Sequence, residues 1–129
     1  DAVGAVANYP CPLIIIDMGT ATTISVVDGN QNFIGGMIMP GLMVSRDAMS
    51  AKAAQLPQIS LEAPKKTIGR NTVECGAIRH IEEELGTSCT VVSTGGLSAL
   101  VTPHCKRKVI QDSDLLLKGM MILYHKNQT

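Results

Sequence analysis

The chain has 129 residues, the length of one ordinary domain, and 45% of them are hydrophobic, which is enough for a buried core. Eleven basic and eleven acidic residues give a formal net charge of zero, so the broad basic field that binds nucleic acid or anionic lipid is missing. With two Tyr, one Phe and no Trp, the chain also has few aromatic platforms for stacking bases. We therefore expect a soluble domain that binds neither nucleic acid nor membranes.

Targeting signals and metal motifs are weak. No apolar stretch approaches the roughly 18 residues that suggest a membrane span, and residues 1–10 carry no positively charged segment ahead of an apolar run. The four cysteines form no CxxC pair, which favours free thiols over zinc despite the adjacent His104 and Cys105. Free thiols are typical of the reducing cytoplasm, where we expect this protein to reside.

Three strands are predicted in the first forty residues. Residues 12–17 form a short apolar run rich in β-branched side chains, typical of a strand buried on both faces. Residues 23–28 alternate in the half-buried manner, and the turn sequence DGN at 28–30 leads into a third strand at 32–39. The glycine pair at 35–36 indicates a bulge or the close approach of another element or a ligand.

Helices alternating with single strands are predicted after Pro40-Gly41, which ends the third strand. The expected elements are a helix over 42–54, a helix over 77–85, a strand over 90–93, a weaker strand over 108–110, and a last helix from a cap at Asp112 or Ser113 to Tyr124. The inner face of the last helix is expected to carry Leu116, Gly119, Met120 and Leu123. This order predicts one α/β domain over residues 1–129 with a mixed sheet.

The most informative segment is DMGTATT at 17–23, between the first two predicted strands. A buried strand delivers Asp17 to the edge of the sheet, Gly19 lets a ligand approach the backbone, and Thr20 offers a hydroxyl beside free amides. Such a loop suits polyphosphate oxygens and a cation. A plain structural turn, whose hydroxyls bind their own backbone, is the alternative.

A second glycine turn, STGGL at 93–97, follows another buried strand and contains Gly95 and Gly96. Taken alone it is most simply a tight turn. Two glycine turns after strands in one small α/β domain favour a nucleotide cleft, in which they face each other across the carboxyl edge of the sheet. Further along the chain from the first turn, GRNT at 69–72 offers either a helix cap or a polar contact to a small acidic substrate.

These segments together resemble the type III pantothenate kinases, members of the actin-like, Hsp70-like and sugar-kinase superfamily. The resemblance implies a ribonuclease H-like fold and ATP-dependent phosphorylation of pantothenate, the first step of coenzyme A biosynthesis. Four motifs occur in the family's order: DMGTATT at 17–23 for phosphate, GGMIMPG at 35–41 for the next strand and turn, IGRNT at 68–72 for the substrate, and STGGL at 93–97 for adenosine.

The resemblance also implies roles for individual residues. Asp17 would help to hold the potassium or ammonium ion that these kinases require, while Gly19 and Thr20 would contact the phosphates of Mg²⁺-bound ATP. Gly95 and Gly96 would border the nucleotide. Thr72 would contact pantothenate across a homodimer interface, so that two chains build one site.

Three departures from the family pattern are visible. A full member has two such domains, and the first domain and the general-base Asp, expected just upstream of Asp1, lie outside this sequence. Relatives carry an additional stretch where Cys75 meets Gly76, so we expect a gap there, and Lys52-Ala53 replaces a basic residue or His followed by Thr. We therefore expect the C-terminal half of a two-domain kinase.

Other functions fit the same motifs. Phosphate-binding motifs indicate the fold but do not identify the molecule that accepts the phosphoryl group. Another small-molecule kinase of the superfamily is therefore one alternative. A non-catalytic nucleotide-binding or regulatory relative is another, because the general base and first phosphate loop are missing from the sequence. The least specific alternative is a structural α/β domain that binds no ligand.

Overall fold

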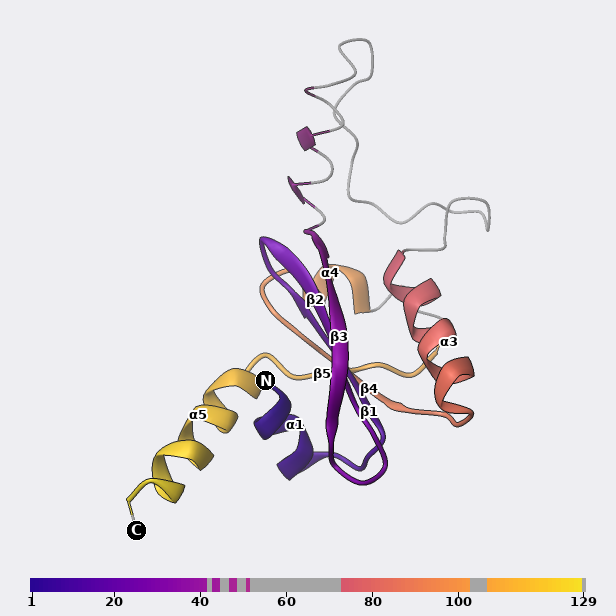
Figure 1. The fold of residues 1–129 in the computed structure, drawn as a ribbon. Helices are drawn as coiled ribbons and strands as arrows, with labels where there is room; N and C mark the ends of the chain where they lie inside the picture. The colour runs from indigo at the N-terminus through magenta and orange to yellow at the C-terminus, as the bar shows by residue number, and fades with distance from the viewer. Residues whose placement is uncertain (42, 45–46, 49–50, 52–72, 103–106, 129) are drawn as a thin grey trace.

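A five-stranded mixed sheet forms the centre of the molecule in the order β3-β2-β1-β4-β5, as Figure 1 shows. The computed structural model describes residues 1–41, 43–44, 47–48, 51, 73–102 and 107–128. Antiparallel pairing joins β1 (Leu13–Met18) to β2 (Ala21–Val27) and β2 to β3 (Phe33–Pro40). Parallel pairing joins β4 (Thr90–Thr94) to β1 and β5 (Ile110–Gln111) to β4. The predicted mixed sheet with three hairpin-linked strands is confirmed.

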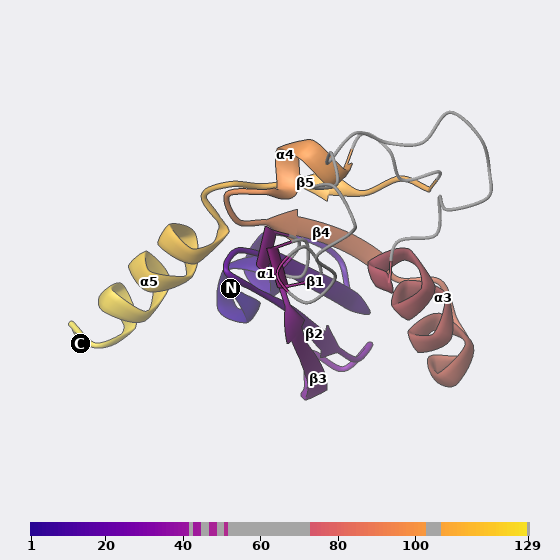
Figure 2. The same ribbon diagram turned by 90° about the horizontal axis from the view of Figure 1, so that it is seen from above.

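Helices cover the two faces of this sheet, as the view in Figure 2 makes clear. One face packs against α3 (Val73–Leu85) and the other against α1 (Ala2–Asn8) and α5 (Leu115–Lys126). The short α4 (Ser98–Val101) follows β4 at the end of the sheet that carries the β1–β2 turn. None of the described helices is long and apolar enough to cross a membrane.

The central strand β1 contributes to two cores because its side chains alternate between the faces. Ile14 and Ile16 pack in the core that includes Ile78 of α3. Leu13 and Ile15 pack in the opposite core, which includes Leu115 of α5. All four β1 side chains are buried, which confirms the prediction of a strand covered on both faces.

The hairpin between β2 and β3 has the predicted turn and the predicted irregularity. Asp28 Oδ1 accepts hydrogen bonds from the backbone amides of Asn30 and Asn32, both at 2.9 Å. The strand register shifts between Val26 and Val27, and a Cβ on Gly36 would overlap the backbone of β2. The close approach expected at the glycine pair is therefore that of the neighbouring strand.

Several predicted boundaries are wrong. The sequence analysis missed α1, whose seven residues lack a side-chain cap hydrogen bond. The helix expected at 77–85 begins at Val73 and continues through Gly76, and the last strand lies at 110–111 rather than 108–110. The predicted helix over 42–54 lies largely outside the described residues.

The predicted cap of the last helix is also wrong, and its predicted inner face is right only at Gly119. Asp114 occupies the N-cap position of α5 without a side-chain cap hydrogen bond, and its backbone amide donates to the Asp112 carboxylate at 3.1 Å. Leu115 and Gly119 are the buried positions. The expected inner residues Leu116, Met120 and Leu123 are 47–56% exposed. Apolar residues lie on every side of this helix, so its sequence pattern does not select one face.

Candidate functional site

A polar row crosses three neighbouring strands where the apolar β1 sequence ends. Asp17 of β1 pairs with Thr23 of β2 on one side and with Thr94 of β4 on the other. Residues directly paired across neighbouring strands lie on the same face of a sheet, so these side chains share the face of α1 and α5. Thr94 is buried, whereas Asp17 and Thr23 are half-buried. The row presents a carboxylate and two hydroxyls at the carboxyl edge of β1 and β4.

The glycine turn after β4 packs directly against Asp17. A Cβ on Gly95 would lie 2.6 Å from Asp17 Oδ1 and 2.6 Å from the carbonyl oxygen of Met18. Gly95 has φ +95°, which strains any other residue, and the Leu97 amide donates a 3.0 Å hydrogen bond to the Met18 carbonyl. The two predicted glycine turns therefore face each other, as expected from their places after neighbouring strands.

The β1–β2 turn is closed by the segment that follows β3. The Gly19 amide donates to the Ala21 carbonyl at 3.2 Å, and the Gly41 amide donates to the Thr20 carbonyl at 2.9 Å. A Cβ on Gly41 would overlap the carbonyl oxygen of Thr20. Sequence analysis treated Gly41 only as a strand terminator, and its position directly after Pro40 is the only local signal for this contact. The Thr20 side chain is exposed at the tip of the turn.

Ser98, a residue that the sequence analysis did not single out, fixes the turn after β4. Its hydroxyl donates to the Gly95 carbonyl at 2.8 Å, and its backbone amide donates to the same oxygen at 3.2 Å. The side chain is buried, which secures both bonds from water. The sequence signal that could have identified Ser98 is its spacing of three residues from a glycine in the turn.

Two of the site glycines have space around them. A Cβ on Gly96 would meet nothing within 4 Å, and a Cβ on Gly19 would meet only the Ala21 carbonyl oxygen, at 3.8 Å. Internal packing therefore requires glycine at Gly95 but not at these two positions. Bare backbone with space above it suits the close approach of a phosphate or a flat base.

The chemistry of the donors suits a hard cation. The polar row offers a carboxylate, hydroxyls and nearby backbone carbonyls, all of them oxygen ligands. Within the part of the chain that the structure describes, no three His, Cys, Asp or Glu side chains come together as a metal site. Cys11 and Cys89 are free thiols, and burial raises the pKa of Cys89.

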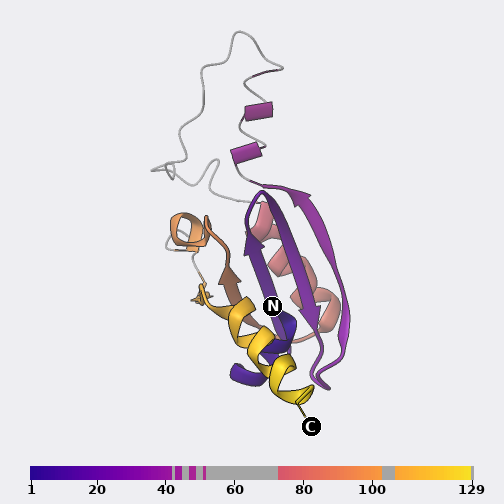
Figure 3. The same cartoon turned by 90° about the vertical axis from the view of Figure 1, so that its left-hand side faces the viewer.

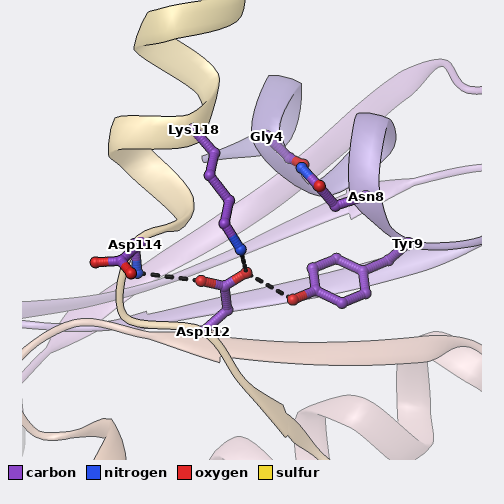
Figure 4. Close-up of polar contacts among 6 residues, drawn as sticks. All are labelled: Gly4, Asn8, Tyr9, Asp112, Asp114 and Lys118. Carbon is purple, nitrogen blue, oxygen red and sulfur yellow. Dashed lines mark hydrogen bonds and ion pairs between the residues drawn. The ribbon is translucent and has the colours of Figure 1, made fainter.

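A second carboxylate lies beyond the polar row but is already satisfied, as Figure 4 shows. Asp112 Oδ2 accepts hydrogen bonds from the Tyr9 hydroxyl at 2.6 Å and from Lys118 Nζ at 2.7 Å. Burial opposes ionisation, but these bonds and the amide of Asp114 outweigh it and lower the pKa of Asp112. Hydrogen bonding to Asp112 raises the pKa values of Tyr9 and Lys118. This cluster joins α1 to α5.

The substrate side of the predicted site lies outside the described residues. Thr72, the IGRNT motif at 68–72 and the departure at Lys52-Ala53 all fall there. The described geometry therefore covers Asp17, Gly19 and Thr20 on one turn and Gly95 and Gly96 on the other.

Comparison with known families decides what this chain is related to. The sequence model of the Pan_kinase family, described as type III pantothenate kinase, matches residues 1–80. The chain belongs to the type III pantothenate kinase family. The type III pantothenate kinase of Exiguobacterium sibiricum is 40% identical over 142 aligned positions, covering 99% of this chain and 56% of the relative. That of Brevibacillus brevis is 38% identical, covering 100% and 56%. The chain thus spans little more than half the length of these curated relatives.

Solved structures show the fold of this type III pantothenate kinase chain. A Baf family transcriptional activator from Campylobacter jejuni superposes with a TM-score of 0.63 at 24% identity, over 98% of this chain and 62% of that one. The activator of 2-hydroxyisocaproyl-CoA dehydratase from Clostridium difficile, solved with bound ADPNP, gives 0.51 at 13% identity, over 99% and 67%. These likenesses confirm the expected ribonuclease H-like, actin-like ATPase fold.

Proposed function

We propose that the enzyme containing this chain transfers the γ-phosphoryl group of ATP to pantothenate and forms 4′-phosphopantothenate in the cytoplasm. The observation that carries the proposal is the contact between Asp17 and the Gly95 turn at the carboxyl edge of the sheet. In a member of the pantothenate kinase family, this arrangement suits the phosphate and cation side of the active site.

Each part of the site would contribute positioning and neutralisation of charge, which dominate catalysis of phosphoryl transfer. Asp17 would hold a potassium or ammonium ion, and the open backbone at Gly19, with Thr20, would contact the phosphates of Mg²⁺-bound ATP. Gly95 and Gly96 would border the nucleotide. The resemblance to the family adds Thr72 as a pantothenate contact across a homodimer interface and a general-base Asp just upstream of Asp1.

The potassium dependence of turnover tests this role for Asp17. In the full-length enzyme, Asp17→Asn should abolish the activation of pantothenate-dependent ADP formation by potassium, because the amide carries no charge to hold the ion. Asp28→Asn is the matched control, since Asp28 lies in the β2–β3 turn at the other end of the sheet. Potassium activation that persists unchanged in Asp17→Asn would contradict the assignment.

A non-catalytic nucleotide-binding module is the second candidate, favoured by the open backbone at Gly19 and Gly96, which suits nucleotide binding whether or not turnover follows. ATP binding without turnover, measured for the natural full-length protein with potassium and Mg²⁺ present, would support the module. If turnover occurs, a panel of sugar and small-alcohol acceptors separates a pantothenate kinase from another kinase of the superfamily.

A further inference from the structure

The backbone amide of Gly96 is an unused hydrogen-bond donor in the turn after β4. The two amides that follow it are bonded: Leu97 donates to the Met18 carbonyl at 3.0 Å, and Ser98 donates to the Gly95 carbonyl at 3.2 Å. Within the part of the chain that the structure describes, no group accepts a hydrogen bond from the Gly96 amide. Gly96 is exposed, and a Cβ there would meet nothing within 4 Å. A ligand can therefore reach this donor.

The direction of the Gly96 amide is set by the carbonyl of Gly95, because the two belong to one peptide group. That peptide is trans, so its C=O and N–H bonds point in opposite directions. The Ser98 hydroxyl and the Ser98 amide hold the carbonyl at 2.8 and 3.2 Å. The N–H of Gly96 therefore points away from Ser98.

Other constraints on this peptide are weak. Rotation of the peptide changes only ψ of Gly95 and φ of Gly96, and neither residue has a Cβ to oppose it. The helix α4, which Figure 3 shows in orange just beyond the end of β4, has four residues and is too short to order the turn by itself. The Ser98 hydroxyl makes the shorter of the two bonds to the Gly95 carbonyl, and its side chain is buried. This hydroxyl is the main group that selects one orientation of the peptide.

We propose that Ser98 is a positioning residue for nucleotide binding, because it holds the Gly95 carbonyl so that the Gly96 amide is presented to the nucleotide as a donor. The inverted peptide would present a carbonyl oxygen, which repels phosphate oxygens and cannot donate to any acceptor atom. This role rests on the nucleotide-binding part of the proposed function, in which Gly95 and Gly96 border the nucleotide. It is independent of which molecule accepts the phosphoryl group.

The affinity of the full-length enzyme for ADP tests this role, measured by titration calorimetry with Mg²⁺ and potassium but without pantothenate. Ser98→Ala should raise the Kd for ADP about tenfold, as expected for one lost hydrogen bond that orients a binding group. Ser98→Cys keeps nearly the same volume but supplies only a weak donor, so it should raise the Kd as well and serves if the alanine variant does not fold.

Thr102→Val is the matched control at the other end of α4. The hydroxyls of Thr102 and Ser93 are hydrogen-bonded at 2.7 Å, and neither touches the Gly95 carbonyl. The valine variant therefore removes a hydroxyl hydrogen bond from the same helix without releasing the peptide. Its Kd for ADP should change by less than about twofold.

Gly96→Pro tests whether Ser98 acts through the amide, because proline has no N–H. Gly96 has no positive φ and has space for a Cβ, both of which favour acceptance of a proline. This variant should weaken ADP binding by a similar factor. Adding Ser98→Ala to it should weaken binding by less than about twofold more, because the donor is already absent.

Several results would overturn the role of Ser98. One is an unchanged Kd for ADP in a Ser98→Ala enzyme whose thermal unfolding shows that it is folded. Equal weakening by Ser98→Ala and Thr102→Val would show a general loosening of α4 instead. A full effect of Ser98→Ala in the Gly96→Pro enzyme would exclude the amide as the route. Failure of the pantothenate assignment would appear in turnover alone, since ADP binding requires no acceptor.

Discussion

The helices α3 and α5 are nearly equal in length, with 13 and 12 residues, but they meet the sheet in different ways. In α3, Ile78 and Ile81 are buried in the core, while Arg79 and Glu83 form an exposed pair across one helical turn at 4.0 Å. In α5, the large apolar side chains after Leu115 are mostly exposed. The described apolar side chains on the inner face of α3 are therefore buried within this chain, whereas most of those of α5 are not.

The two helices also differ in what holds them. Side chains anchor α3, through apolar contacts with the strands. Backbone contact at Gly4 and Gly119 and the polar cluster around Asp112 anchor α5, together with the single buried side chain of Leu115. Substitutions in the two helices should therefore act by different mechanisms and with different magnitudes.

Truncation of a large apolar side chain should give the largest difference in stability effect between the two helices. Ile78→Ala should lower the free energy of unfolding of the chain by about 3 kcal/mol, because it leaves a cavity in the core. Met120→Ala removes a comparable side chain from α5 but should cost less than about 0.5 kcal/mol, because that residue is 56% exposed. Urea unfolding measures both, and similar losses would show that α5 is packed in the isolated chain.

Adding one methyl group at a helix glycine should give a smaller contrast. Gly4→Ala should destabilise the chain by about 2 kcal/mol, because the new Cβ would overlap the Leu115 carbonyl and force α1 away from α5. Gly76→Ala in α3 meets nothing within 4 Å and should stabilise the chain by up to about 1 kcal/mol through helix propensity. Thermal unfolding of the pair checks both signs, and a neutral Gly4→Ala would contradict the close helix contact.

Removal of the buried charge at Asp112 should have a pH-dependent effect. Asp112→Asn weakens the hydrogen bonds to Tyr9 and Lys118 and should cost about 1–2 kcal/mol at neutral pH. The folded-state pKa of Asp112 is lowered, so its contribution is present above the ordinary carboxyl pKa of 3.8 and is lost as the pH falls through the lower folded value. The free energies of unfolding of the wild type and the variant, measured between pH 7 and pH 3, should become more alike as the pH falls. A difference that grows on acidification would exclude this cluster as the cause.

The sequence predicted the parts of the fold whose periodicity was unambiguous. Continuous apolar residues at 13–16 and alternation in β2 identified the central strands, and their order placed Asp17 opposite the Gly95 turn. The short helix α1 was missed although Asp1, at its N-cap, is a residue type that favours helix starts, and its glycine matters only through contact with a helix more than a hundred residues away. The role of Gly41 was missed because its contact with Thr20 forms only in the folded chain. Ser98 contacts the nearby Gly95, so its three-residue spacing from that glycine was an overlooked local signal.

Direct detection of the product tests the central claim most simply. The full-length enzyme is incubated with ATP, Mg²⁺, potassium and pantothenate, and the products are identified by mass spectrometry. The account predicts ADP and 4′-phosphopantothenate in equal amounts, with little product when sodium replaces potassium. ATP bound at the Asp17 and Gly95 site without any phosphorylated pantothenate would contradict it.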